Sequence, residues 1–202
     1  MLLRLLPRSE LPLQIVPDLR SNNGESLPNE TAHASLFSVG DVTGIVKENN
    51  WLTADPDEKQ MAWCARAAAI LGPQVTDRAT LADLLRLVFE YDPRAILQTT
   101  EAHVVMSRYA ARDVLRQLAL LLLEGAPLTN ERFSEIITRL KEGLDIRGRE
   151  LFHPIRLALA GRSGEGELDR VILLLEEAAA AGFTVPAKTA RERILEFCSV
   201  FE

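Results

Sequence analysis

Residues 145–162 read DIRGRELFHPIRLALAGR, a basic turn followed by an apolar pair and a proline-initiated helix. The turn is Arg147-Gly148-Arg149, and the apolar pair is Leu151-Phe152. Proline suits the first helical position because the N–H there has no partner, and glycine commonly ends a helix. The spacing therefore predicts a short helix from Pro154 to Ala160 that stops at Gly161.

Helical signals continue on both sides of this stretch. Capping residues, first-turn acids and apolar residues spaced three and four apart indicate amphipathic helices, which Gly and Pro separate. The predicted helices are Asp55–Leu71, Thr80–Asp92, Thr100–Glu124, Thr129–Gly143, Glu167–Ala181 and Lys188–Val200. No convincing strand is present, so the sequence predicts an all-α fold.

The predicted helices are unevenly distributed along the chain. Residues 1–50 lack hydrophobic periodicity and concentrate turn formers, as in Ser21-Asn22-Asn23-Gly24, which indicates an extended N-terminal arm with at most one short strand or turn of helix. The rest divides near residues 125–130 into two packed helical subdomains. These are expected at residues 51–126 and at residues 127–202, the second with an added C-terminal helix.

Composition agrees with a helical, water-exposed domain and restricts its partners. The chain has 202 residues, of which 47% are hydrophobic and only 5% aromatic. Leu, Ala and Arg are abundant, and these residues lose little side-chain freedom in a helix. The 23 basic and 29 acidic residues give a formal net charge of -6, so the overall field repels a polyanion. Any contact with RNA must therefore be local.

Sites for metals, cofactors and catalysis are not evident. The His and Cys residues are scattered, without metal-ligand spacing, at His33, His103, His153, Cys64 and Cys198. The glycine-rich segment Gly161–Gly166 follows no strand and carries acids, so it indicates a helix–helix turn and not a phosphate loop. No apolar run reaches the roughly eighteen residues of a membrane span. We expect a cytoplasmic protein without metal, cofactor or membrane.

The 145–162 segment resembles the carboxy-terminal, all-helical anticodon-binding region of bacterial glutamyl-tRNA synthetase. That family carries a basic-Gly-basic turn, an apolar pair and then Pro-Leu/Ile-Arg-x-Ala-Leu-x-Gly, which matches Pro154 to Gly161. Weaker similarity extends over residues 51 to about 182. It includes the helix of Trp63, the turn Arg78-Ala79-Thr80-Leu81 and the helix end Tyr91-Asp92-Pro93.

The resemblance implies a helical cage that recognises a tRNA anticodon. The catalytic domain of the family, with its His-x-Gly-His-type and Lys-Met-Ser-Lys-Ser-type signatures, should precede this region, and neither signature occurs in residues 1–50. We therefore expect no aminoacylation by this chain alone. The helix expected within Phe183–Glu202 has no clear counterpart in the family.

Five arginines are the RNA-binding residues that the resemblance implies. Arg78 falls near an anticodon-reading arginine of the family, and Arg147, Arg149 and Arg162 match basic positions that could touch phosphates. Arg156 also matches, but its place between Ile and Leu is equally compatible with a buried ion pair. For each of the five, an ordinary structural role is the alternative.

A second candidate surface is a stripe along the predicted Thr100–Glu124 helix. Arg108, Arg112 and Arg116 are spaced four residues apart and so should share one face. Asp113 lies beside them, and solvated helix faces often have this composition. An ordinary solvated face is therefore the favoured interpretation of the stripe.

Three functional hypotheses follow. The chain is a stand-alone tRNA anticodon-binding module, or a domain repurposed for protein interaction or regulation, or one piece of a split or truncated synthetase. Its expected partners are accordingly tRNA, another protein, or a separate catalytic half. The acidic net charge favours protein interaction because phosphate contacts dominate nucleic-acid affinity. The turn at Arg147–Arg149 favours RNA.

Overall fold

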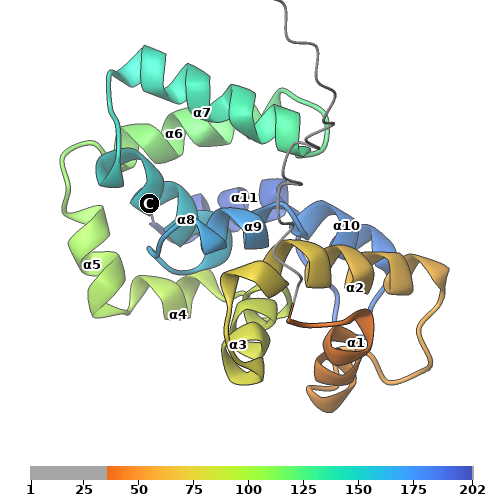
Figure 1. Ribbon diagram of the computed structural model, residues 1–202. Helices are drawn as coiled ribbons and strands as arrows, with labels where there is room; N and C mark the ends of the chain where they lie inside the picture. The colour runs from red at the N-terminus through yellow and green to blue at the C-terminus, as the bar shows by residue number, and fades with distance from the viewer. Residues whose placement is uncertain (1–35, 202) are drawn as a thin grey trace, which may run out of the picture. The chain divides into compact units, whose positions relative to one another are not determined.

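The computed structural model describes residues 36–201, and within this range every regular element is a helix (Figure 1). The all-α prediction is therefore confirmed. The elements are α1 (Val39–Glu48), α2 (Glu58–Leu71), the 3-10 helix η1 (Gly72–Gln74), α3 (Arg78–Phe89), α4 (Pro93–Leu97), α5 (Thr100–Met106), α6 (Ala111–Leu123), α7 (Asn130–Leu144), α8 (Arg149–Ala160), α9 (Glu167–Ile172), α10 (Leu175–Ala181) and α11 (Ala190–Phe201).

Most helices begin at a side chain that accepts a hydrogen bond from the exposed N–H groups of the first turn. Asp57 and Gln60 form a capping box at α2, Asp77 accepts from the Thr80 N–H at α3, and Thr129 accepts from the Arg132 N–H at α7. At the other end, α8 and α10 each stop at a glycine in the left-handed conformation. These local signals are the ones that the sequence displays.

Helix α1 corrects the expected extent of the N-terminal arm. Ser38 and Asp41 form a capping box, and Val42, Ile45 and Val46 are buried against the rest of the core. The expectation of an extended arm up to residue 50 is therefore wrong for residues 39–48. The apolar spacing is present but covers barely two turns, so it is masked by the turn formers before it. Residues 1–35 of the expected arm lie outside the described residues.

Two predicted helices are each divided in the structure. The expected helix Thr100–Glu124 consists of α5 and α6, separated by the turn Ser107–Ala110. The Ser107 hydroxyl donates to the carbonyl of Val104, which competes with continuation of the helix. Likewise, Glu167–Ala181 consists of α9 and α10. Periodicity extends across both breaks because apolar side chains on either side face the same core.

Helix α8 begins earlier than the sequence predicts. The N–H groups of Leu151 and Phe152 both donate to the carbonyl of Gly148, so the first helical residue is Arg149. Pro154 consequently lies inside the helix and not at its start. The basic turn and the helix are thus one continuous element, and Arg149 belongs to its first turn.

An aromatic cluster joins the helices of the N-terminal half to the C-terminal ones. Phe89 contacts both Trp51 and Phe183, with ring centroids 4.8 and 5.0 Å apart. Trp63 packs edge-on against Phe183 at 5.0 Å, and its indole N–H donates to the carbonyl of Leu174. Burial of several large rings contributes a substantial part of the driving force for folding.

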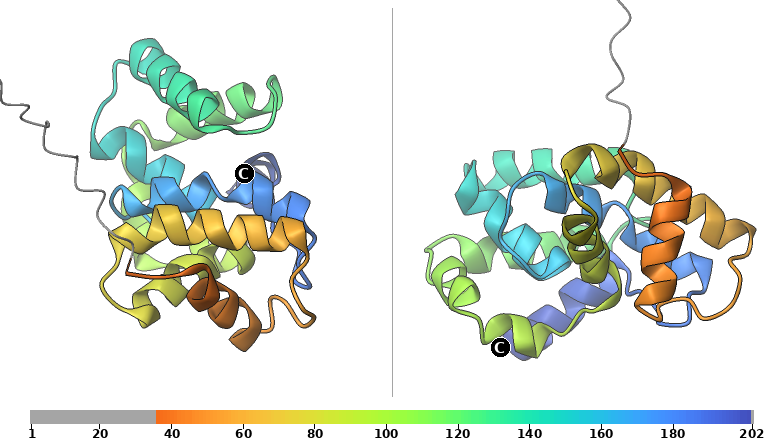
Figure 2. Two further views of the ribbon diagram at one scale, coloured as in Figure 1. Left: turned by 45° about the vertical axis from the view of Figure 1, so that its right-hand side comes forward. Right: turned by 60° about the horizontal axis from the view of Figure 1, so that its bottom comes forward.

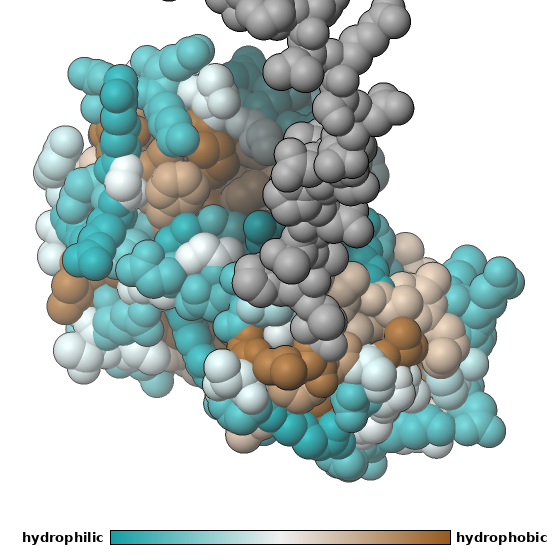
Figure 3. Space-filling model, in the orientation of Figure 1, coloured by the Kyte–Doolittle hydropathy of each residue, from teal (hydrophilic) through white to brown (hydrophobic). Residues whose placement is uncertain are grey.

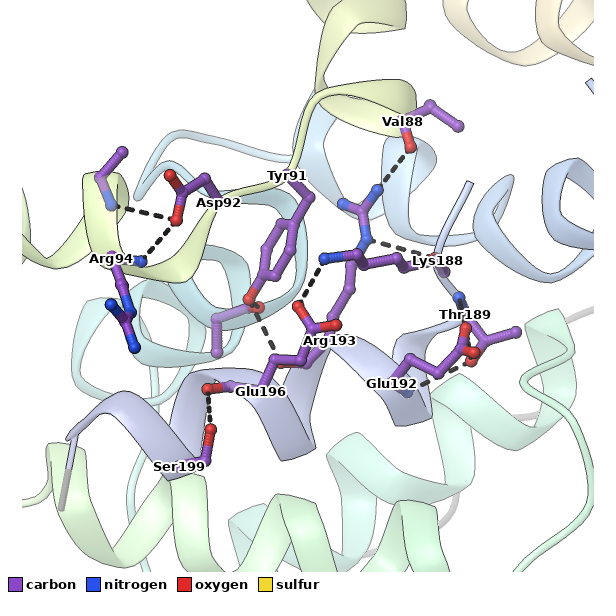
Figure 4. Close-up of polar contacts among 12 residues, drawn as sticks. Val88, Tyr91, Asp92, Arg94, Lys188, Thr189, Glu192, Arg193, Glu196 and Ser199 are labelled. Atoms are coloured by element: carbon purple, nitrogen blue, oxygen red, sulfur yellow. Dashed lines mark hydrogen bonds and ion pairs between the residues drawn. The ribbon is translucent and has the colours of Figure 1, made fainter. Parts of the chain in front are cut away.

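Helix α11 is fixed to the core by Arg193, as Figure 4 shows. This side chain is fully buried and donates to the carbonyls of Leu87 and Val88 at the end of α3 and of Leu159 at the end of α8. Its guanidinium also lies 4.5 Å from the centre of the Tyr91 ring. Burial lowers the pKa of Arg193 to about 10, but two helix C-termini and these carbonyls stabilise the cation.

The described residues all belong to one compact unit. Helices α6 and α7 pack together as a pair, α11 packs on both α6 and α8, and α2 packs on α1, α9 and α10 (Figures 1 and 2). Helices α6 and α11 belong to different expected subdomains and pack on each other. The division of the chain near residue 126 stays a prediction. No helix in the described range is long and apolar enough to cross a membrane.

Candidate nucleic-acid interface

The loop between α7 and α8 presents the basic turn to solvent. Asp145 ends α7 in the left-handed conformation, with φ of 52°, and Gly148 precedes α8 with φ of 58° and ψ of -139°. The second conformation is essentially restricted to glycine. A Cβ added at Gly148 would meet no atom within 4 Å, so backbone conformation and not space requires the glycine. The loop therefore places Arg147 directly before this glycine and Arg149 directly after it.

Three of the five predicted arginines are exposed near this loop. The guanidinium of Arg149 lies 3.7 Å from the carboxylate of Glu165, and both side chains are about three-quarters exposed. An ion pair this exposed contributes little to stability. Arg147 and Arg162 are also exposed, and in residues 36–201 neither side chain has a hydrogen bond or ion pair. Their donors remain free for a ligand.

Arg108 joins this surface, although it was predicted for another one. Its guanidinium donates to the carbonyl of Arg149 at 3.1 Å and lies 3.6 Å from the Glu150 carboxylate. The turn between α5 and α6 is thereby attached to the first turn of α8. In Figure 1 this turn and the α7–α8 loop lie on the same side of the structure. We call Arg108, Arg147, Arg149 and Arg162 the arginine rim.

His153 lies among the charged side chains of this region. Its Nδ1 atom is buried and has no hydrogen-bond partner in the structure. Burial lowers the pKa of His153, and the nearby charges of Arg108, Arg149 and Arg156 lower it further. The carboxylate of Glu165 opposes the effect of these arginines, so burial is the main cause of the lowered pKa.

Arg156 is buried, and only 7% of it is exposed. It forms two hydrogen bonds of 2.8 Å to the carboxylate of Asp169 and one of 2.7 Å to the carbonyl of Gly164. Its guanidinium also stacks over the Phe152 ring at 4.9 Å. Of the two interpretations, the structure shows the buried ion pair. Arg156 holds the Gly161–Gly166 loop in position and is too enclosed to contact a phosphate.

Arg78 contacts residues of α1. It bonds to the Glu48 carboxylate at 2.6 Å and to the Asp41 carbonyl at 3.2 Å, so it links α3 to α1. Within the described range, no hydrogen bond or ion pair connects it to the arginine rim. The contacts of Arg78 therefore lie with α1, and its expected role in RNA binding stays a prediction.

The predicted stripe of Arg108, Arg112 and Arg116 does not exist as a continuous surface. Arg108 precedes α6, and its side chain is directed to α8 as described above. Arg112 stacks on Phe201 at 5.0 Å, and Arg116 lies 4.0 Å from Asp113. These two arginines instead border a groove of about 470 Å³. The groove is lined by Arg112, Leu115, Arg116, Ala119, Leu120, Cys198 and Phe201.

The structural roles of Arg193 and Arg108 differ in how far the sequence indicates them. The buried position of Arg193 follows the period of α11, in which Ile194 and Phe197 are also buried, so its place in the apolar pattern was a usable signal. The contact of Arg108 depends on the helix break at Ser107, which local periodicity does not reveal.

Figure 3 shows hydrophilic residues over much of one face, with hydrophobic residues in a hollow beneath α6 and α7.

Comparisons with known proteins match this chain over most of the described helices. The family model for the anticodon binding domain matches residues 42–178, which include α2 to α9, most of α1 and part of α10. Helix α11 lies outside that match. No solved structure matches significantly.

Curated relatives are glutamate–tRNA ligases. Glutamate–tRNA ligase 2 of Syntrophus aciditrophicus is 29% identical over 123 residues, which cover 61% of this chain and 25% of that protein. Glutamate–tRNA ligase of Desulforudis audaxviator is 31% identical over 144 residues, or 67% of this chain and 27% of that protein. This chain thus spans about a quarter of the length of these relatives.

Proposed function

This chain belongs to the anticodon binding domain family, and from that membership we propose that it binds the anticodon loop of a tRNA through the arginine rim. The observation that carries the proposal is the pair of exposed guanidiniums at Arg147 and Arg162 without a protein partner, beside the weakly paired Arg149. All three lie inside the family match. Guanidinium groups suit phosphate because they donate two parallel hydrogen bonds.

The acidic net charge limits this mode of binding to a small footprint. Each neutralised phosphate of a single strand contributes about -0.7 to the slope of log affinity against log salt concentration. Three rim arginines at phosphates therefore give a slope of about -2. The surrounding negative charge selects for a short loop and against a long duplex.

A filter-binding titration tests this proposal. A glutamate or glutamine tRNA and an unrelated tRNA are compared at two salt concentrations. The Arg147→Ala, Arg149→Ala double variant should bind more weakly, with the slope reduced by about 1.4. The matched control is Arg86→Ala, Arg139→Ala, which removes the same charge from exposed helix surfaces elsewhere. Equal binding by wild type and both variants, or no binding by wild type at low salt, would exclude the proposal.

The proposed module is non-catalytic by itself. The chain aligns with only a quarter of each ligase, and the nucleotide-binding signatures of the synthetase family are absent from its sequence. We expect no ATP binding in calorimetry and no glutamate attachment to tRNA by the purified chain. Charging activity that copurifies with the protein and persists after further purification would contradict this expectation.

A second candidate function rests on the groove between α6 and α11. Its floor is apolar and its border carries Arg112 and Arg116, so it is complementary to an acidic amphipathic helix of a partner protein. Helix α11 lies outside the family match, so one wall of the groove is an element that the family model does not cover. A separate catalytic half is one such partner.

The groove is tested with a fluorescent synthetic helix that carries Leu on one face and Glu on the other. Anisotropy should rise on titration with wild type and change much less with the Arg112→Glu, Leu120→Asp variant. An Arg86→Glu, Met61→Asp variant makes the same changes at exposed positions outside the groove. If that control and the groove variant lose binding equally, the groove is not the site.

A further inference from the structure

Tyr109 is the most exposed large apolar or aromatic side chain in the described part of the chain, with 84% of it accessible. It lies in the turn between α5 and α6, directly after Arg108. Every other aromatic side chain in residues 36–201 is buried or half-buried. A ring that displays both faces to water is therefore unique in this range, and no core or cap interaction accounts for it.

The turn that carries Tyr109 is held firmly. Arg108 donates to the carbonyl of Arg149, and the backbone N–H groups of Arg108 and Ala111 donate to the carbonyls of Val105 and Arg108. Ala110 is buried directly after the tyrosine. Neighbouring residues on both sides are thus anchored, so the turn presents the ring from a defined backbone and not from a free loop.

The surroundings of the ring define the ligand that it suits. The Cα of Tyr109 lies about 3.8 Å from that of Arg108, whose guanidinium reaches the first turn of α8. Arg108 contacts the Arg149 carbonyl and the Glu150 carboxylate, so the turn lies against the first turn of α8, where the Arg149 side chain is exposed. Proteins that bind single-stranded nucleic acids combine an exposed aromatic ring, on which a base stacks, with nearby cationic groups that neutralise the backbone.

We propose that Tyr109 is a stacking platform for one unpaired base of the bound RNA, whose backbone follows the arginine rim. This inference rests on the proposed function and adds a residue that the family motif does not include. Stacking is tolerant of base identity because every base has a π-face. Tyr109 therefore contributes affinity, while sequence selectivity comes from other contacts.

The test uses an anticodon stem-loop RNA with 2-aminopurine at one loop position at a time. Stacking on an aromatic ring quenches the fluorescence of this base. Wild type should quench one loop position, Tyr109→Phe should do the same, and Tyr109→Ala should abolish the quenching. Affinity should fall by roughly fivefold to a hundredfold in Tyr109→Ala, with an unchanged salt slope, because a stacked base is uncharged at the contact.

Two further variants make the outcomes distinct. Leu195→Ala removes another exposed apolar side chain, on α11, and should change neither affinity nor quenching. If Tyr109→Ala binds like wild type while Arg147→Ala, Arg149→Ala binds weakly, the stacking proposal is wrong and the arginine rim stands. If wild type binds no stem-loop, both fail. A wild-type chain that self-associates through Tyr109, measured by sedimentation, would assign the ring to a protein contact instead.

Discussion

Arginines of one sequence motif have opposite environments in this protein. Arg156 and Arg149 are separated by two turns of α8, yet the first is enclosed by Asp169, Gly164 and Phe152, and the second extends into solvent. Burial of a guanidinium requires a carboxylate and carbonyls around it. Arg156 consequently supports the loop on which Arg162 is displayed, and only the exposed arginines remain available to RNA.

Arg156→Ala should destabilise the fold by about 2–4 kcal/mol, because Asp169 and the Gly164 carbonyl lose their partner. The matched variant Arg149→Ala should change stability by less than about 0.5 kcal/mol, since its pair with Glu165 is exposed. Urea denaturation followed by circular dichroism measures both. Similar midpoints for the two variants would contradict the assignment of Arg156 to the buried network.

His153 should make stability depend on pH. Its pKa in the folded chain lies below the ordinary value of 6.5, because burial and the charges of three arginines disfavour the imidazolium more than the Glu165 carboxylate favours it. Below about pH 6.5 the unfolded chain therefore binds a proton that the folded chain does not, so stability falls as pH falls. His153→Gln should reduce this loss between pH 7 and pH 5.5 in urea denaturation. An identical pH dependence in the variant would show that other groups cause it.

At the scale of elements, the backbone conformation of the α7–α8 loop requires glycine at position 148, although a side chain there would meet no neighbouring atom. Gly148→Ala should destabilise by about 1–3 kcal/mol because its φ and ψ are strained for any residue with a Cβ. Gly143 lies in the last turn of α7, and a Cβ there also meets nothing within 4 Å. Gly143→Ala should therefore stabilise by about 0.4–1 kcal/mol. Thermal denaturation of the two variants should shift in opposite directions.

Besides its buried apolar side chains, helix α11 is attached to the core through the hydrogen bonds of Arg193. Arg193→Met keeps the apolar length but leaves the carbonyls of Leu87, Val88 and Leu159 without this donor. Each unsatisfied buried carbonyl costs about 1–3 kcal/mol, so the variant should be strongly destabilised. Arg191→Met, at an exposed position of the same helix, is the control and should behave like wild type. If hydrogen exchange at α11 were equally slow in both variants, Arg193 would not be the anchor.

Element prediction from the sequence succeeded where caps and stops are local. Helix α7 was expected from Thr129 or Asn130 to Gly143 and spans Asn130–Leu144, because its cap and its apolar face are both explicit in the sequence. The break at Ser107 was missed because periodicity continues through it. The early start of α8 was missed because Pro154 suggested a first-turn position, whereas the Gly148 carbonyl already accepts helical bonds.

The candidate site was predictable only in part for the same reason. Exposure of Arg147 and Arg149 follows from their places in the α7–α8 loop and at the start of α8, but the inclusion of Arg108 and the display of Tyr109 depend on how α5 and α6 pack against α8. Such tertiary contacts connect residues some forty positions apart. No local pattern encodes them.

At the scale of the whole molecule, an acidic chain displays a small group of exposed arginines. The net charge of -6 opposes long polyanions, and the arginine rim provides a small surface of the opposite sign. The same charge pattern suits a short RNA loop on one side and an acidic partner helix at the α6–α11 groove on another. The two surfaces share no lining residue.

The most direct measurement of the central claim is a titration of ¹⁵N-labelled protein with an anticodon stem-loop RNA, followed through the arginine side-chain resonances. The side-chain signals of Arg147, Arg149 and Arg162 should shift with the RNA concentration. Those of the buried Arg156 and Arg193 should stay in place. Shifts confined to Arg112 and Arg116, or no shift in any arginine at low salt, would contradict RNA binding at the arginine rim.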